Sequence, residues 1–140
     1  MGTFSAKVDK NRRIQLPASW IPDDVRPEFT LLFWPRSGGI DVLPPAALKE
    51  LKDKLCERDP SPETLTLVRA IGANSVCVTL AARRRLTLPE QLLAKAGIIS
   101  EAKLVGMVDR FLICRPGRDE RDEPTMSEVL QKIESLIAPQ

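Results

Sequence analysis

The sequence contains no histidine, and its three cysteines stand at scattered positions. Without histidine, the usual zinc sites, Ser-His-Asp triads and Cys-His pairs cannot form. The chain also lacks a glycine-rich phosphate loop and a carboxylate pair beyond ordinary surface charge, so we expect no enzyme, no metal and no cofactor. An odd number of cysteines without a CxxC motif is not a disulfide framework, and we expect Cys56, Cys77 and Cys114 to be small core residues.

Long hydrophobic runs are absent as well. Every apolar run falls far short of the roughly 20 residues that a membrane helix needs, and the N-terminus has no apolar signal core. These absences predict a cytoplasmic protein with no membrane partner. Hydrophobic residues still make up 43% of the 140 positions, which is enough for one compact domain or two very small ones.

Positive charge is concentrated in two short regions of the chain. Residues 1–20 carry a net charge of +3, and so do residues 76–95. Because the whole chain carries only +2, the remaining residues sum to −4. Such a distribution predicts a basic surface that meets phosphate groups.

The two basic regions contain nearly the same motif. The stretch DKNRRIQLP spans residues 9–17, and AARRRLTLP follows 72 positions later at 81–89. The same offset places GGIDVLPP, at 38–45, over RFLICRPG, at 110–117. A repeat at a fixed offset indicates two copies of one unit of roughly 45 residues. We therefore predict a first unit at 1–46, a helical insert at 47–73, a second unit at 74–117, and a charged linker with a C-terminal helix at 118–140.

Each unit opens with apolar and polar residues that alternate on both sides of a polar break, which is a β-hairpin signal. The basic residues occupy the turn and the outer face of each hairpin. A second strand pair follows in each unit, with tight turns expected at Gly38-Gly39 and Asp109-Arg110. The inward residues are Phe4, Ala6, Val8, Ile14 and Leu16 in the first hairpin and Val76, Val78, Leu80, Leu86 and Leu88 in the second.

A short helix is predicted after each hairpin. The stretch LPEQLLAKAGI, at 88–98, predicts a helix that Pro89 starts and Gly97 ends. The corresponding stretch LPASWIPDD, at 16–24, predicts only one or two helical turns, because Pro22 interrupts it.

The insert and the C-terminus are also predicted to be helical. Apolar residues in the insert recur at spacings of three and four, which is typical of an amphipathic helix. Near the C-terminus, Thr125 and Glu128 form a capping-box pattern. The helix that follows has an apolar stripe that must pack on something, made of Val129, Ile133 and Leu136.

With these motifs the chain resembles the MraZ family of bacterial transcriptional regulators, whose units are AbrB-like swapped-hairpin modules. The family's DxxxR signature appears as DKNRR, at 9–13, and AGIISEAKLVGMVDRFLICRP, at 96–116, is similar to its AGL…EVLVG…FEIW stretch. The resemblance implies an α+β fold with a mainly β core, in which tandem AbrB-like βαββ-type units form a small β-barrel with a helical insert and a C-terminal helix. It also implies a ring-shaped homo-oligomer that binds double-stranded DNA at repeated promoter boxes and is associated with the nucleoid.

The chain departs from the family pattern in both motifs. The family usually has glycine where Arg12 and Arg84 stand, in a turn where a positive φ suits glycine. Either the turn differs here, or Asn11 takes the left-handed position. The second motif keeps its arginine, Arg85, but has Ala81 in place of the aspartate.

The repeat and the resemblance together predict a DNA-binding site on the two hairpins. Arg13 and Arg85 are its central residues, because a guanidinium group can clamp phosphate or bind a guanine edge through two hydrogen bonds. Asp9 is expected to hold the first hairpin through an ion pair with Arg13, which makes the second copy the more electropositive one. The other cations expected to contact DNA are Lys7, Lys10, Arg12, Arg83 and Arg84.

Two other functions are compatible with the sequence. The chain could be a ring-forming protein-interaction or assembly module that lacks specific DNA binding, which Ala81 and the missing turn glycines favour. It could also be an antitoxin-like AbrB module that neutralises a toxin through its charged linker and terminal helix.

Overall fold

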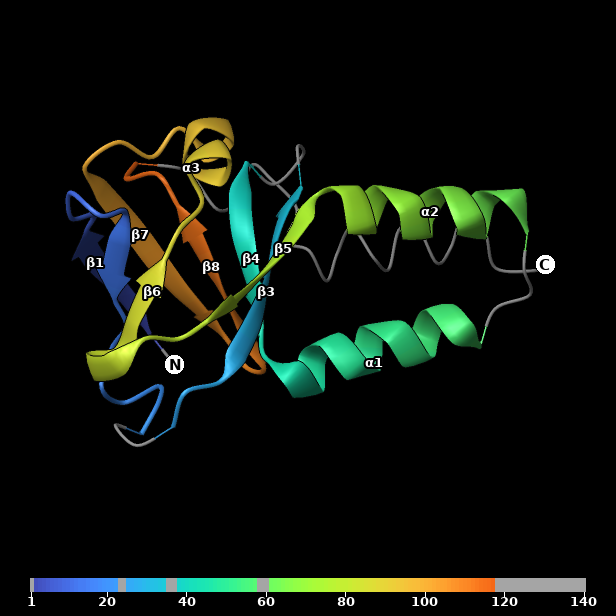
Figure 1. Cartoon of the computed structure of the whole chain (residues 1–140), viewed down its shortest axis with the longest axis horizontal. Helices are drawn as coiled ribbons and strands as arrows, with labels where there is room; N and C mark the ends of the chain where they lie inside the picture. The colour runs from blue at the N-terminus through green and yellow to red at the C-terminus, as the bar shows by residue number, and fades with distance from the viewer. Residues whose placement is uncertain (1, 23–24, 35–37, 58–60, 118–140) are drawn as a thin grey trace.

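Eight β-strands and three α-helices make up the described part of the computed structural model, which covers residues 2–22, 25–34, 38–57 and 61–117 (Figure 1). The chain therefore has the predicted α+β fold with a mainly β core. The strands are β1 (Thr3–Lys7), β2 (Arg13–Gln15), β3 (Glu28–Trp34), β4 (Gly39–Leu43), β5 (Ser75–Thr79), β6 (Arg85–Thr87), β7 (Glu101–Met107) and β8 (Arg110–Cys114). The helices are α1 (Pro45–Cys56), α2 (Pro62–Ala73) and α3 (Glu90–Ala96), and a 3-10 turn, η1 (Ala82–Arg84), precedes β6.

Six of the strands form one antiparallel sheet in the order β1-β7-β8-β4-β3-β5. The other two, β2 and β6, pair with each other as a two-stranded ribbon. The ribbon lies on one side of the sheet, and α1 and α2 lie on the other side (Figure 1). The predicted closed barrel is not found among the described strands, because β2 and β6 bond to each other and leave β1 and β5 as sheet edges.

The first strand of each half of the chain pairs with a strand of the other half. β1 pairs with β7, so that Thr3 lies opposite Val105. In the same way β5 pairs with β3, and Ser75 lies opposite Leu32. The predicted pairing of β1 with β2, and of β5 with β6, is therefore wrong. Alternation with a period of two identifies the faces of a strand but not the strand to which it bonds.

The inner face of the ribbon packs on the sheet and forms the main core. Ile14, Leu16, Leu86 and Leu88 are all predicted to point inward, and each is at most 1% exposed. Burying one such side chain contributes about 1.5–3 kcal/mol, so these four residues hold the ribbon firmly against the sheet. The same core cluster includes residues of α3 and of the central strands β4 and β8.

Three residues that were predicted to be buried are exposed instead. Phe4 is 38% exposed, Val76 is 41% exposed, and the Cys77 side chain is exposed as well. All three lie on β1 or β5, the edge strands, which have a neighbouring strand on one side only. Cys114 lies on the central strand β8 and is buried, as predicted, whereas the side chain of Cys56 is not among those described.

The second of the two predicted short helices forms, and the first does not. α3 begins directly after Pro89 and ends at Gly97, whose φ of +70° is left-handed and suits glycine. In the stretch 16–24 the chain makes a turn, closed by the Trp20 N–H donating to the Pro17 carbonyl at 3.1 Å. Residues 23–24 lie outside the described part of the chain.

Two turns between strands lie at other residues than predicted. Met107 pairs with Arg110, so the β7–β8 turn consists of Val108 and Asp109. Gly39 is already part of β4, so the β3–β4 turn lies before it. The β7–β8 error is a shift of one residue, which a sequence pattern does not resolve. Of the residues between β3 and β4, only Gly38 is described.

The predicted helical insert consists of α1 and α2, which both extend away from the same side of the sheet (Figure 1). Ser61 caps α2, because its hydroxyl oxygen accepts a hydrogen bond from the Thr64 N–H at 3.1 Å. Leu43 of β4 and Leu51 of α1 belong to a second, smaller core cluster. Within the described ranges no helix is long and apolar enough to cross a membrane. The predicted linker and C-terminal helix, at 118–140, lie outside these ranges.

Candidate nucleic-acid interface

The outer face of the β2–β6 ribbon brings the two central arginines together. Because Ile14 and Leu86 point into the core, their neighbours along each strand point outward. Arg85 lies directly opposite Gln15 in the ladder, so Arg13 is its diagonal neighbour on the same face. Diagonal neighbours in an antiparallel pair are about 7–8 Å apart. Two residues that are 72 positions apart in the sequence therefore form one small basic surface.

Asp9 organises the turn between β1 and β2. Its Oδ1 accepts hydrogen bonds from the backbone N–H groups of Asn11, at 2.8 Å, and Arg13, at 2.9 Å. Its Oδ2 accepts a hydrogen bond from Arg13 Nε at 3.2 Å, which makes an ion pair. The Arg12 N–H also donates to the Asp9 carbonyl at 3.0 Å. One carboxylate thus shapes the turn and orients the Arg13 side chain.

The hydrogen bonds to Asp9 also change its protonation. They lower the pKa of the Asp9 carboxyl, and the hydrogen bond from the Arg13 backbone is the largest cause. Asp9 is therefore ionised at neutral pH and partly neutralises the guanidinium beside it. Since the Asp9 side chain is 41% exposed, the ion pair itself adds little to stability, and its main effect is to orient Arg13.

The turn before β6 is built without a carboxylate. Ala81 takes the place of Asp9, and its N–H donates to the Arg85 carbonyl at 2.9 Å. Gln15 reaches across from β2, and its Nε2 donates a hydrogen bond to the Arg83 carbonyl. Arg85 makes no ion pair with any described residue. The second turn is therefore held partly by the opposite strand, and no described carboxylate pairs with its arginine.

Three arginines of the two turns have left-handed backbone conformations. Arg12 has a φ of 61°, Arg83 a φ of 61° and Arg84 a φ of 56°. The alternative in which Asn11 takes the left-handed position is therefore wrong. A side chain with a Cβ is strained in this region by about 1–2 kcal/mol, and glycine is not. The turns thus have the shape that suits glycine but carry positive charge at these positions.

The strain at Arg12 predicts the result of one substitution. Arg12→Gly is expected to leave the free energy of unfolding unchanged or to raise it by up to about 1 kcal/mol, because relief of strain outweighs the entropy that glycine loses on folding. Lys10→Gly removes the same charge at a residue without a positive φ, and should cost about 0.5–1 kcal/mol. Urea unfolding of both variants measures the difference. Equal losses in the two variants would contradict the strain argument.

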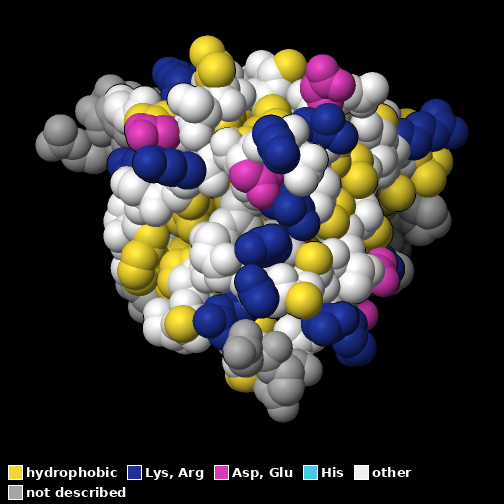
Figure 2. Space-filling view, turned by 60° about the vertical axis from the view of Figure 1, so that its left-hand side comes forward, with side chains coloured by type: hydrophobic (Ala, Val, Ile, Leu, Met, Phe, Trp, Pro, Cys, Tyr) yellow, Lys and Arg dark blue, Asp and Glu magenta, His cyan; other side chains and the backbone are white. Residues whose placement is uncertain are grey.

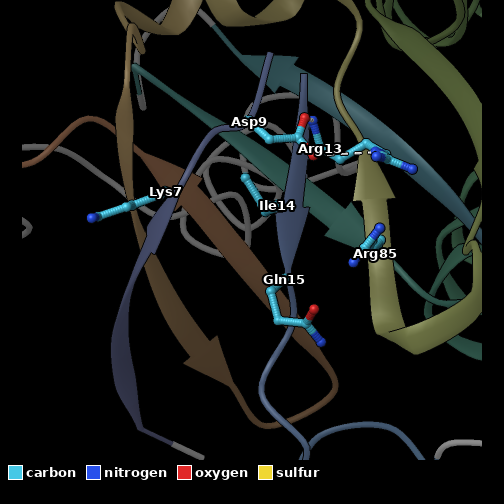
Figure 3. A pocket seen from close by; sticks show the side chains of 6 residues that line it. All are labelled: Lys7, Asp9, Arg13, Ile14, Gln15 and Arg85. Carbon is cyan, nitrogen blue, oxygen red and sulfur yellow. Dashed lines mark hydrogen bonds and ion pairs between the residues drawn. The ribbon is translucent and has the colours of Figure 1, made fainter. Parts of the chain in front are cut away.

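A shallow hollow of about 360 Å³ lies between β1, β2 and the start of β6 (Figure 3). In this view the Arg13 side chain extends from β2 toward β6, the Arg85 side chain lies on β6, and Lys7 points outward from β1. The hollow is open to solvent and mixes positive groups with the Asp9 carboxylate. Its lining residues are Lys7, Asp9, Arg13, Ile14, Gln15 and Arg85.

The other predicted cations lie in the two turns that adjoin the ribbon. Lys10 and Arg12 belong to the first turn, and Arg83 and Arg84 belong to the second. Figure 2 shows the molecule turned toward this side, where Lys and Arg side chains follow one another in a band across the surface. The exposed members of the predicted set are Lys7, Lys10, Arg12 and Arg83, and the half-buried ones are Arg13, Arg84 and Arg85.

Two ribbon residues were not predicted to belong to the site. Gln15 and Thr87 lie on the outer face, opposite Arg85 and Arg13 respectively. The sequence signal was present, because both residues share the period-two face of the arginines. A glutamine amide and a threonine hydroxyl can bond to bases and phosphates. No group of His, Cys, Asp or Glu residues that could hold a metal ion occurs among the described residues.

A basic two-stranded ribbon on a mainly β scaffold is an arrangement that proteins use to bind the major groove of DNA. No family model matches the chain. The chain is, however, 26% identical over 151 aligned positions to a transcriptional regulator MraZ from Parvibaculum lavamentivorans, strain DS-1. The alignment covers 99% of this chain and 94% of that relative. The resemblance to MraZ is thereby confirmed as a distant similarity over the full length.

Proposed function

We propose that the chain is a sequence-specific DNA-binding transcriptional regulator that binds through the β2–β6 ribbon. The observation that carries this proposal is the position of Arg13 and Arg85, which are diagonal neighbours on the outer face of one ribbon. The full-length similarity to a transcriptional regulator supports it. The antitoxin-like alternative depends on residues 118–140, which lie outside the described part of the chain, and the assembly alternative depends on contacts between chains.

The dimensions of the ribbon suit the major groove. That groove is about 12 Å wide and admits a two-stranded β-ribbon. Arg13 and Arg85 are the candidates for hydrogen bonds to guanine edges, since both lie on the outer face of the ribbon, Arg13 at the start of β2 and Arg85 at the start of β6. Lys10, Arg12 and Arg83 lie in the turns at the ends of the ribbon and are placed for phosphate contacts, which position the protein but carry no sequence information.

The strand pairing supports an interpretation of the fold as two AbrB-like units that exchange strands. β1 on β7 and β5 on β3 are equivalent pairs under the repeat, and so are β3 on β4 and β7 on β8.

One ribbon makes few base contacts and binds weakly. We propose that a homo-oligomer, arranged as a ring, places several ribbons on repeated promoter boxes and gains affinity through effective concentration.

The two arginines should differ in how strongly they respond to salt. Arg85→Ala is expected to reduce the slope of log K against log salt, by up to about 1, because it removes one positive charge from the surface that faces the DNA. Arg13→Ala should reduce it by less, because Asp9 already neutralises part of the Arg13 charge. Fluorescence anisotropy with a promoter duplex at several salt concentrations measures both slopes. A larger reduction for Arg13→Ala would contradict this asymmetry.

The function itself is tested with DNA from the region upstream of the protein's own gene. Tight binding to repeated boxes, with a large preference over scrambled DNA of the same length, is the expected result. Weak binding that is indifferent to sequence would overturn the proposal and favour the assembly module instead. Binding should be measured at a stated salt concentration, because electrostatic attraction to the phosphates gives tight binding at low salt without any sequence specificity.

A further inference from the structure

An apolar groove lies on the far side of the sheet from the ribbon, between the two helices of the insert. It has a volume of about 260 Å³ and is floored by β3, β4 and β5. Its wall residues are mostly leucine, valine and isoleucine, with one lysine at the side. The lining from the helices comprises Leu48, Leu51, Lys52, Leu55, Val68, Ile71 and Gly72.

The groove carries apolar surface that the described elements leave uncovered. Val68 lines it and is 44% exposed, and Leu65, one helical turn earlier on α2, is 50% exposed. Cys77, on the edge strand β5, also lines the groove and is exposed. Apolar walls between two helices are the usual receptor for the apolar face of a third helix.

We propose that this groove is the docking site for the C-terminal segment of the same chain, residues 129–137. That segment carries the apolar stripe Val129, Ile133 and Leu136, whose spacing of four and three places the three side chains on one helix face. The stripe is a one-sided apolar surface by its sequence, and the groove is an apolar surface that the described elements leave open. Packing them together removes both from water.

The length of the chain allows this docking within one molecule. The described part ends at Gly117, and residues 118–128 separate it from the stripe. Eleven extended residues span about 36–40 Å, which exceeds the roughly 30 Å diameter of a small domain. Charge does not oppose the docking, because Lys132 and Glu134 offset each other in the segment and Lys52 is the one charged residue among those that line the groove. This inference does not depend on the proposed function.

Cys77 provides a test by disulfide formation. Val129→Cys, Ile133→Cys and Leu136→Cys are made separately in the full chain, with Gln131→Cys and Ser135→Cys as controls on the opposite helix face. After mild oxidation, at least one stripe variant is expected to form a disulfide with Cys77 inside one chain, found by peptide mass spectrometry in protein of monomer mass. Two cysteines must come within about 7 Å between Cα atoms to form such a bond.

Three results would overturn the proposal. They are no disulfide to Cys77 in any stripe variant, equal disulfide yields in stripe and control variants, and a disulfide that joins two chains, which would assign the groove to a second copy. Hydrogen exchange of the unmodified chain gives an independent check, because it requires no substituted variant to fold. Amides of residues 129–137 should exchange at least about tenfold more slowly than those of 118–124, and equal rates would count against docking.

Discussion

Replacement of both ribbon arginines, in the variant Arg13→Ala/Arg85→Ala, is expected to weaken binding to promoter DNA roughly 30-fold to 20,000-fold. Each arginine that forms two hydrogen bonds with guanine contributes about 1–3 kcal/mol, so the pair contributes about 2–6 kcal/mol if the two contacts are independent. They are diagonal neighbours on one ribbon, so some coupling is expected, and the single variants will reveal it. Anisotropy titration at fixed salt measures the change.

The control for this variant keeps the change in net charge the same. Arg69→Ala/Arg115→Ala removes two exposed arginines, one on α2 and one after β8, outside the ribbon and its turns. It should lower affinity only a few-fold, through the weaker long-range field. If the two double variants lose affinity equally, the ribbon face is not the binding surface. Discrimination between promoter and scrambled DNA should also fall only in Arg13→Ala/Arg85→Ala.

The largest loss of stability is expected for Ile14→Ala. Ile14 is 1% exposed and lies on the inner face of β2, where it packs into the main core between ribbon and sheet. Truncation of a buried isoleucine to alanine removes apolar contacts and leaves a cavity, at a cost of about 2–5 kcal/mol. Denaturant unfolding, with the midpoint and the slope fitted together, measures this loss.

Ile99 gives a matched control for Ile14. It is the same residue type but is 89% exposed, after α3. Ile99→Ala should change the free energy of unfolding by no more than about 0.5 kcal/mol. A loss at Ile99 as large as that at Ile14 would mean that Ile99 is buried in solution, for example between subunits, and a concentration-dependent midpoint would identify that case.

The sequence predicted the faces of the ribbon strands correctly but not their partners. Ile14 and Leu86 alternate with arginines, and this alternation alone assigns one side to the core and the other to solvent. The alternation does not identify β6 as the partner of β2, because strand pairing depends on how the whole chain packs around the core. Edge positions were misjudged for the same reason, because Phe4 and Val76 look like core residues until the strand order is known.

The turns were the least predictable part of the candidate site. Asn11 tolerates a positive φ better than arginine does, so a local argument places the left-handed residue there. The structure gives that conformation to Arg12, because the Asp9 carboxylate accepts the Asn11 N–H and so fixes the backbone of that residue. Gln15 was overlooked because it is uncharged, although it joins the two halves of the site through its bond to the Arg83 carbonyl.

The ribbon is made from one strand of each half of the chain, and this has a consequence for synthesis on the ribosome. β2 is complete once residue 15 has been made, but β6 ends at residue 87, so the two arginines cannot meet until more than half of the chain has left the exit tunnel. The pairing of β1 with β7 is possible only later still, because β7 ends at residue 107. Contacts of such sequence separation form late and slowly. A nascent or prematurely terminated chain therefore carries the charge of the first turn but no assembled ribbon, and cannot compete with the finished protein for its target.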